Sequence, residues 1–211
     1  MKIPLFFSLF ILFVVFFNIK LRKASKEIEN SNANFWKRER ESMFARKKSL
    51  DHLNYISVSL NDLPMLKEEE LFSDAEKKAY SHQKTALSLA SKPMLNLSGI
   101  SNTDLKLQYG PANLENLMSY EQNYENLIKS LLNWGRYLKE ANRTSDAIAV
   151  LEKAVSIGSD LSQNYILLSD LYRETQQIDK LLSLKNEVEN RLKQNAMQKK
   201  VLQYIDNILN M

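Results

Sequence analysis

The sequence predicts an all-helical protein, in which an N-terminal transmembrane helix precedes a small α-solenoid domain built from helical hairpins. Three observations predict this class. An uncharged apolar run fills residues 3–19, the chain keeps a helical apolar pattern after Pro111, and that pattern repeats at an interval of about 34 residues. At 211 residues, the chain suits one small domain with attachments. We expect a single transmembrane anchor at residues 1–20, a basic juxtamembrane segment at 21–48, a helix with ordered loops at 49–112, and helical repeats with a capping helix at 113–211.

The composition excludes several kinds of chemistry. Because the chain has no Cys, it has no disulfide, cysteine-ligated zinc or thiol nucleophile. Its four Gly are too dispersed for a phosphate-binding loop. The two histidines, His52 and His82, lie far apart in the sequence, and no paired acids or Ser-His-Asp order is visible. We therefore expect no enzymatic activity, no catalytic residue, no cofactor and no metal site.

The predicted anchor is the apolar run at residues 3–19, which Lys2 and Lys20 bracket. As a helix it would span about 25 Å, slightly less than the roughly 30 Å of a bilayer core. A cleaved signal peptide is the alternative interpretation. The run is longer than the usual signal-peptide core of about 7–15 residues, and no small-residue cleavage site precedes the charges. We therefore favour an uncleaved anchor.

Basic residues directly after this run predict its orientation. Lys20, Arg22, Lys23 and Lys26 follow it, and such residues resist translocation, so we expect a single-pass protein of the cell membrane with its C-terminal domain in the cytoplasm. Residues 20–48 carry 10 Lys and Arg against 4 Glu, whereas residues 49–211 carry 18 basic and 21 acidic residues. The pI near 9.0 therefore reflects the juxtamembrane segment, and no nucleic-acid partner is expected.

The juxtamembrane segment mixes aromatic and charged residues. If it is helical, Phe35, Trp36, Met43 and Phe44 fall near one side. This side could lie on anionic lipid, with which residues 20–48 would then be in contact. A solvated charged stalk that continues the anchor explains the pattern equally well, and both interpretations stay open.

The middle of the chain predicts loops around one helix. We expect that helix over residues 67–92, from the acidic residues 68–70 to the stop at Pro93, with His82 as an ordinary half-exposed side chain. We expect an ordered loop before Pro111. Its short polar side chains could form a site, but capping of turns by these side chains is the simpler explanation. They are Asn96, Ser98, Ser101, Asn102, Thr103 and Asp104.

The repeat interval relates two helical hairpins. Each hairpin has a break, at residues 142–145 and 175–177. Because about three units are needed to bury a continuous core, helices at 114–127 and 195–210 are expected to flank the hairpins. Six of the seven pairs that the shift aligns match in size or polarity class. The aligned pairs are Leu131 with Tyr165, Trp134 with Leu168, Gly135 with Ser169, Leu138 with Tyr172, Ala147 with Leu181, Leu151 with Lys185, and Ala154 with Val188.

The first hairpin resembles the tetratricopeptide-repeat (TPR) family. It has the large, small and aromatic residues of that pattern at Leu131, Trp134, Gly135, Leu138, Ala147, Leu151 and Ala154. The second hairpin departs from the pattern at Leu181, Lys185 and Val188, and Ser159 replaces an expected Pro. The resemblance covers residues 113–211. It implies packed helices that approach closely at the small residues.

The resemblance also implies a concave groove that binds a protein or peptide partner along the first helices. A carboxylate clamp, as in one subgroup of the family, is suggested only by Asn133 and Arg136, and a solvated surface without a ligand is the alternative for the whole groove. The predicted groove residues are Lys129, Leu132, Asn133, Arg136, Lys139, Ile166, Leu167, Asp170 and Arg173.

The resulting hypothesis is a membrane-anchored scaffold that presents its TPR-like domain to a protein partner, at the cytoplasmic face of the membrane. The alternative is an extracytoplasmic structural or assembly component of the cell envelope with the same domain. Topology separates the two. Richness in Lys, Asn and Ile without Cys suits a bacterial source.

Overall fold

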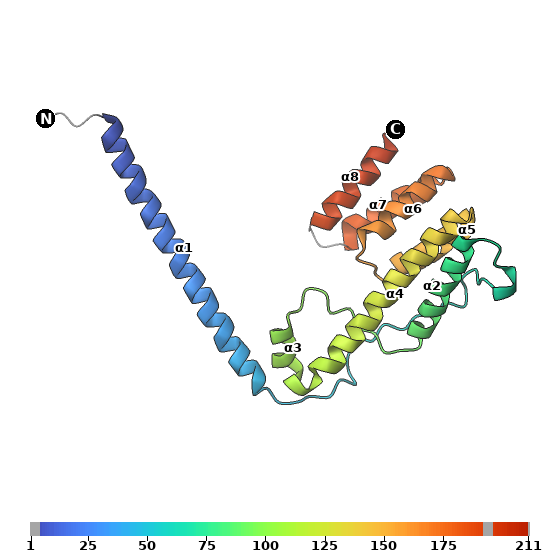
Figure 1. Cartoon of the computed structure of the whole chain (residues 1–211), viewed down its shortest axis with the longest axis horizontal. Coiled ribbons are helices and arrows are strands. Elements are labelled where there is room, and N and C mark those ends of the chain that lie inside the picture. The colour runs from blue at the N-terminus through green and yellow to red at the C-terminus, as the bar shows by residue number, and fades with distance from the viewer. Residues whose placement is uncertain (1–4, 192–195, 211) are drawn as a thin grey trace. The chain divides into compact units, whose positions relative to one another are not determined.

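The computed structural model describes residues 5–191 and 196–210, and all regular elements among them are helices (Figure 1). The all-helical prediction is therefore confirmed for this part of the chain. In chain order the elements are α1 (Leu5–Met43), η1 (Glu68–Glu70), α2 (Asp74–Ala90), α3 (Asn102–Tyr109), η2 (Pro111–Asn113), α4 (Leu114–Glu140), α5 (Thr144–Ser156), α6 (Ser162–Glu174), α7 (Ile178–Arg191) and α8 (Ala196–Leu209).

The chain forms two compact units. The first comprises Met1–His52 and Ser98–Leu117, and the second comprises Leu53–Leu97 and Met118–Met211. Of the predicted middle segment, residues 53–97 belong to the second unit, and residues 49–52 and 98–112 belong to the first.

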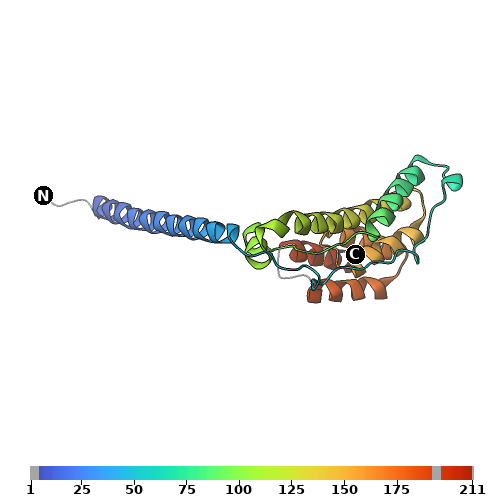
Figure 2. The same ribbon diagram turned by 90° about the horizontal axis from the view of Figure 1, so that it is seen from below.

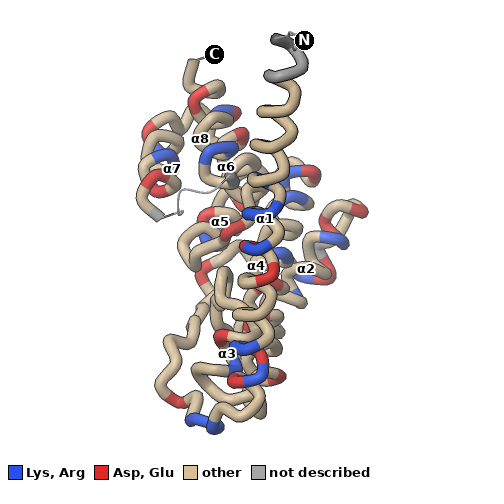
Figure 3. The backbone as a smooth tube through the Cα atoms, turned by 90° about the vertical axis from the view of Figure 1, so that its left-hand side faces the viewer, with Lys and Arg blue, Asp and Glu red and all other residues tan. Residues whose placement is uncertain are grey.

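The predicted transmembrane helix is wrong for the described residues. Within residues 5–191 and 196–210, no helix combines the length and the apolarity needed to cross a membrane. The uncharged part of α1 runs from residue 5 to residue 19, or about 22 Å of helix, and Lys20 then begins a charged stretch. Figure 3 shows this change as uncharged tube followed by Lys and Arg in blue. The first four residues of the predicted anchor lie outside the described residues.

In the first unit, α3 packs against the end of α1 through charged side chains. Arg38 of α1 pairs with Asp104, and Glu39 accepts hydrogen bonds from Lys106 and, at 2.7 Å, from the Thr103 hydroxyl. Ser101 caps α3 by accepting the Asp104 backbone N–H at 3.2 Å. In the predicted polar cluster, Ser101 therefore caps α3, and Thr103 and Asp104 bind α3 to α1.

Helix α3 was not expected, since the sequence predicted a loop before Pro111. It spans only residues 102–109, too short for a clear apolar period. Helix α2 also begins later than predicted, at Asp74. The reason is a capping box: the Ser73 side chain accepts the Glu76 backbone N–H, and the Glu76 side chain accepts the Ser73 backbone N–H. Residues 68–70 form a separate 3-10 turn.

The second unit repeats one helix–turn–helix geometry. Helices α4 and α6 end at Glu140 and Glu174, and helices α5 and α7 begin at Thr144 and Ile178, so both boundaries recur after one repeat interval. The predicted short helix at residues 114–127 is instead the first part of a continuous α4 of 27 residues, because no Gly or Pro interrupts it there (Figure 2).

The core of the second unit is formed by the apolar faces of α2 and of α4 to α8, together with Leu60, Leu63 and Leu66 of the loop before α2. Trp134 is fully buried and Tyr172 is 4% exposed, in agreement with the packing role predicted for both. Gly135 lies so close to α5 that a Cβ atom at this position would come within 2.7 Å of Leu151 Cγ. The predicted close approach of the two helices at a small residue is therefore observed.

Loops before and between the helices are held by buried polar side chains. Gln83 of α2, 4% exposed, accepts the Leu66 backbone N–H at 2.7 Å and donates to the Leu66 carbonyl at 3.0 Å. Where the family pattern has Pro, the buried Ser159 hydroxyl accepts from the Leu161 backbone N–H and from the Asn164 amide at the start of α6. The Ser159 hydroxyl thus holds the chain before α6 through two hydrogen bonds that a Pro side chain could not accept.

Candidate functional site

The nine predicted groove residues lie on two neighbouring helices of the second unit. Side chains connect the two helices: Arg136 Nη2 of α4 donates to Gln163 Oε1 of α6 at 3.0 Å, and Lys139 Nζ pairs with Glu174 Oε1 at 2.7 Å. We call the surface formed by these nine residues the α4–α6 face. Helix α4 contributes Lys129, Leu132, Asn133, Arg136 and Lys139, and α6 contributes Ile166, Leu167, Asp170 and Arg173.

The apolar members of this face are less accessible than expected. Leu132 is 5% exposed and belongs to the core, because it points into the packed interior and not toward solvent. Leu167 is half-buried and packs against the same core, and Ile166 is half-buried as well. The open apolar surface of the face is therefore small.

Lys129 lies at one end of the α4–α6 face. It is exposed and pairs with Glu125 one turn earlier, at 2.8 Å. Lys129 and Glu125 line a cavity of about 240 Å³ together with Ile128, Asp160 and Leu161. A hollow therefore adjoins the face near the start of α6.

Arg136, like Lys139, is a half-buried cation of this face. In addition to Gln163, it donates to Asn133 Oδ1 at 3.2 Å, so both of these partners are neutral amide oxygens. Arg136 also affects His82 of α2. The pKa of His82 lies below its usual value of 6.5, mainly because of burial and secondly because of the positive charge of Arg136.

Asp170 receives a hydrogen bond from a residue that the sequence analysis did not select. Tyr204 of α8 donates its hydroxyl to Asp170 Oδ1 at 2.7 Å, and this bond is the main reason that the pKa of Tyr204 is raised above its usual value of 10.0. Arg173, on the same helix as Asp170, is exposed. Tyr204 follows Asp170 by 34 residues, so extending the repeat by one more interval would have identified it.

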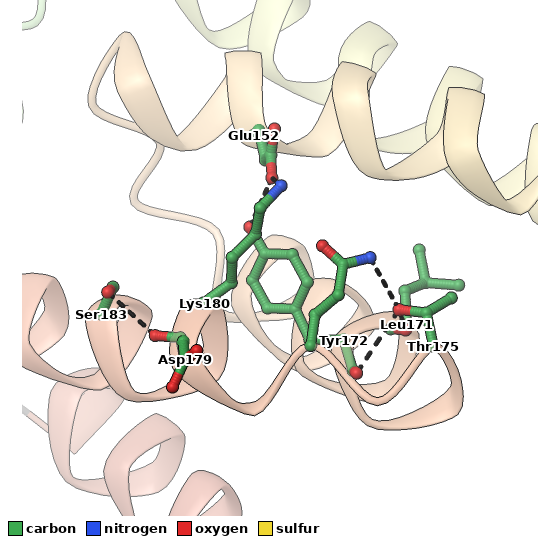
Figure 4. Close-up of polar contacts among 8 residues, drawn as sticks. Glu152, Leu171, Tyr172, Thr175, Asp179, Lys180 and Ser183 are labelled. Atoms are coloured by element: carbon green, nitrogen blue, oxygen red, sulfur yellow. Dashed lines mark hydrogen bonds and ion pairs between the residues drawn. The ribbon is translucent and has the colours of Figure 1, made fainter.

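A second cavity, of about 340 Å³, lies among α5, α6 and α7 and was not predicted. Figure 4 shows Tyr172 of α6 and Lys180 of α7 pointing toward Glu152 of α5. The Tyr172 hydroxyl and Lys180 Nζ both donate to Glu152 Oε1, each at 2.8 Å. Burial is the main reason that the pKa of Tyr172 is raised, and the hydrogen bond to Glu152 adds to it.

Within the described part of the chain, no group of three or more His, Asp and Glu side chains is arranged to hold a metal ion. His52 is exposed, and the ring of His82 stacks on Tyr137 with centroids 5.6 Å apart. His82 is half-buried on α2, in agreement with the prediction of an ordinary half-exposed helix residue.

No protein-family model, curated protein or solved structure matches this chain. The resemblance to the TPR family therefore stays a prediction, which rests on the residues of the first hairpin. The repeat interval itself is a property of the chain's own helices and turns.

Proposed function

We propose that the second unit is a protein-interaction domain, and that its α4–α6 face binds an acidic segment of a partner protein. The proposal rests on the helical-hairpin repeat and on the charges of the face. Lys129, Arg136, Lys139 and Arg173 supply four cations against one acid, Asp170, and two of the four, Lys129 and Lys139, already pair with Glu125 and Glu174 beside the face.

Arg136 is the observation that carries the proposal. Its guanidinium is half-buried and is bound to two neutral amide oxygens, those of Asn133 and Gln163. A carboxylate adds the attraction of opposite charges and can accept two guanidinium N–H groups in a bidentate pair, which a single amide oxygen does not offer. A partner carboxylate that replaces one of these amides would therefore improve the pairing of Arg136.

The other polar groups of the face would orient the partner. Lys139 is paired with Glu174, and Asp170 with Tyr204, so these groups are held in place before binding. Ile166 and Leu167 offer small half-buried apolar patches beside them. Such a combination of a few apolar contacts and fixed polar groups favours recognition of a short segment.

The test reverses the charge of Arg136 and Arg173 together, as Arg136→Glu with Arg173→Glu, in the full chain. Lost pairing and new repulsion should weaken binding of the acidic partner at least tenfold. Thermal melting measured in parallel should change little, since neither side chain belongs to the buried core. The matched control is Lys199→Glu with Lys200→Glu on α8, which makes the same change of net charge at two exposed residues outside the face.

Unchanged partner recovery by the Arg136 and Arg173 variant would show that the α4–α6 face is not the binding surface. Equal loss in the variant and in the Lys199 and Lys200 control would show a nonspecific effect of net charge. The contact of residues 20–48 with anionic lipid, the cytoplasmic placement and the extracytoplasmic alternative stay predictions.

A further inference from the structure

The cavity among α5, α6 and α7 has an apolar floor and a polar rim. Its floor consists of Val155, Leu168 and Leu184, each less than 5% exposed. Glu152 and Glu187 are carboxylates of the rim, one on α5 and one on α7. The cavity therefore has an apolar base and an acidic opening, and the acidic side chains come from α5 and α7.

The hydroxyl groups of the rim can act only as acceptors toward a ligand. Ser156 Oγ donates its proton to the Lys153 carbonyl at 2.8 Å, and Ser183 Oγ donates to the Asp179 carbonyl at 2.9 Å. A serine hydroxyl has one proton to donate but two lone pairs, so both oxygens keep acceptor capacity. With the two carboxylates, the rim presents mainly acceptors.

The donors of the cavity are already directed at Glu152. Lys180 Nζ and the Tyr172 hydroxyl both bond to the same oxygen, Glu152 Oε1. Lys180 is the cation of the lining, against the carboxylates of Glu152 and Glu187, so the lining carries one net negative charge. The negative charges of Glu152 and Glu187 both raise the pKa of Tyr172, which places both carboxylates within electrostatic reach of one point in the cavity.

We propose that this cavity binds a basic side chain, Lys or Arg, of a partner protein, as a site separate from the α4–α6 face. The aliphatic stem of the side chain packs on Val155, Leu168 and Leu184, and its charged head meets Glu187 and Glu152. An acidic ligand would meet two carboxylates and acceptor hydroxyls, and a purely apolar one would leave them without new partners.

Lys180 acts as an internal competitor in this proposal. Its ammonium already neutralises Glu152, so the incoming cation shares or replaces that contact. Lys180 Nζ also lies 5.7 Å from the centroid of the Tyr172 ring, but because its side chain is about half exposed, at 52%, it can exchange both contacts for water at small cost. Removal of the Lys180 charge should therefore strengthen binding, the opposite of what loss of a purely structural ion pair would do.

The experiment titrates the full chain with two blocked amino acids and follows the methyl NMR signals of Val155, Leu168 and Leu184. Nα-acetyl-arginine methylamide is the probe, and Nα-acetyl-norleucine methylamide is its uncharged control. We expect saturable shifts of these three signals with the arginine probe. The norleucine probe should bind at least several-fold more weakly, since it lacks the charged head.

Two variants make the test specific. Glu187→Gln should weaken binding of the arginine probe about fivefold, whereas Glu189→Gln, an equal change of charge at an exposed position two residues away, should leave it unchanged. Lys180→Met should tighten binding about threefold. Thermal melts of all variants verify that each is folded, and Lys180→Met tests the proposal even if Glu187→Gln proves unstable.

Equal binding of the arginine and norleucine probes would overturn the proposal, as would the absence of saturable shifts at the three methyl signals. Weaker binding by the Lys180→Met variant would show that Glu152, Tyr172 and Lys180 only connect the three helices, and it would contradict the role of Lys180 as a competitor. Shifts confined to the α4–α6 face would place the basic ligand elsewhere and would overturn the proposal as well.

Discussion

Asn142 and Gln176 occupy the same position in two turns that lie one repeat interval apart, and both have a left-handed backbone, with φ of 60° and 57°. In each turn the next residue donates its N–H to the third-last residue of the preceding helix: Arg143 to Leu138 and Gln177 to Tyr172, at 2.9 and 2.8 Å. These are Schellman helix ends. The interval is therefore a repeat of backbone conformation as well as of side-chain size.

Gln176→Gly is expected to stabilise the protein. A left-handed conformation costs most residues about 1 kcal/mol, and Gly avoids most of that cost. We expect a gain of about 0.5–1 kcal/mol in the free energy of unfolding, measured by urea denaturation. The matched control is Asn142→Gly, for which we expect a smaller gain because Asn tolerates this conformation. A loss of stability in the Gln176 variant would contradict the turn geometry.

Gly135→Ala is expected to destabilise the second unit although Ala is the better helix former. A Cβ at residue 135 would approach Leu151 Cγ to 2.7 Å, and Leu151 is fully buried and has no room to move. Overpacking of this kind costs about 1–3 kcal/mol, more than the helix propensity of Ala returns. Thermal or urea unfolding of the purified chain measures the loss.

The double variant of Gly135→Ala with Leu151→Ala tests the cause of that loss. Because Leu151→Ala removes the atoms that would clash, it should cost less stability in the Gly135→Ala background than in the wild type. If the losses of unfolding free energy in the two single variants simply add in the double variant, the two residues do not clash. The close approach of α4 and α5 would then be incorrect.

Acidification is expected to loosen α3. The hydrogen bond from Lys106, with that from Thr103, lowers the pKa of Glu39 below its usual 4.5. A carboxylate with a lowered pKa in the folded state contributes stability above its unfolded-state pKa, and this contribution is lost as the pH falls through the folded-state pKa. Hydrogen exchange of the α3 amides, corrected for intrinsic rates, should therefore show protection that falls at low pH.

Glu39→Gln should lower that protection at neutral pH and flatten its pH dependence. Asp104, whose pKa is lowered mainly by the Ser101 hydroxyl and then by Arg38, supplies the remaining dependence. The exposed neighbour Glu41 provides the control, and Glu41→Gln should leave α3 unaffected. Identical exchange profiles for wild type and Glu39→Gln would rule out this pairing as the support of α3.

Apolar periodicity was sufficient to predict the hairpins of the second unit. Buried Trp134 and Leu138 lie four residues apart, at helical spacing, and Tyr172 follows Leu138 after one repeat interval of 34 residues. Helix α3 was missed because eight residues hold too few apolar positions. Its capping signal, Ser101 followed by Asp104, was visible in the sequence.

The candidate sites were harder to predict than the fold. The resemblance selected Leu132 for the groove, but its place on the helix turns it into the core. Glu152 and Lys180 lie 28 residues apart and meet only because α6 packs against both α5 and α7. No local pattern predicts such a pair, since the contact depends on the packing of three helices.

Site-specific photo-crosslinking in cells tests the central claim most directly. A photoreactive amino acid is placed in the full chain at Lys129 or Arg173, which are exposed on the α4–α6 face, and at Thr85 or Ser145, which are exposed outside it. We predict one discrete crosslinked partner at Lys129 and Arg173 that is absent at Thr85 and Ser145, and that binds the purified chain through an acidic segment. Crosslinks of equal strength at all four positions, or a partner whose binding does not depend on acidic residues, would contradict the claim.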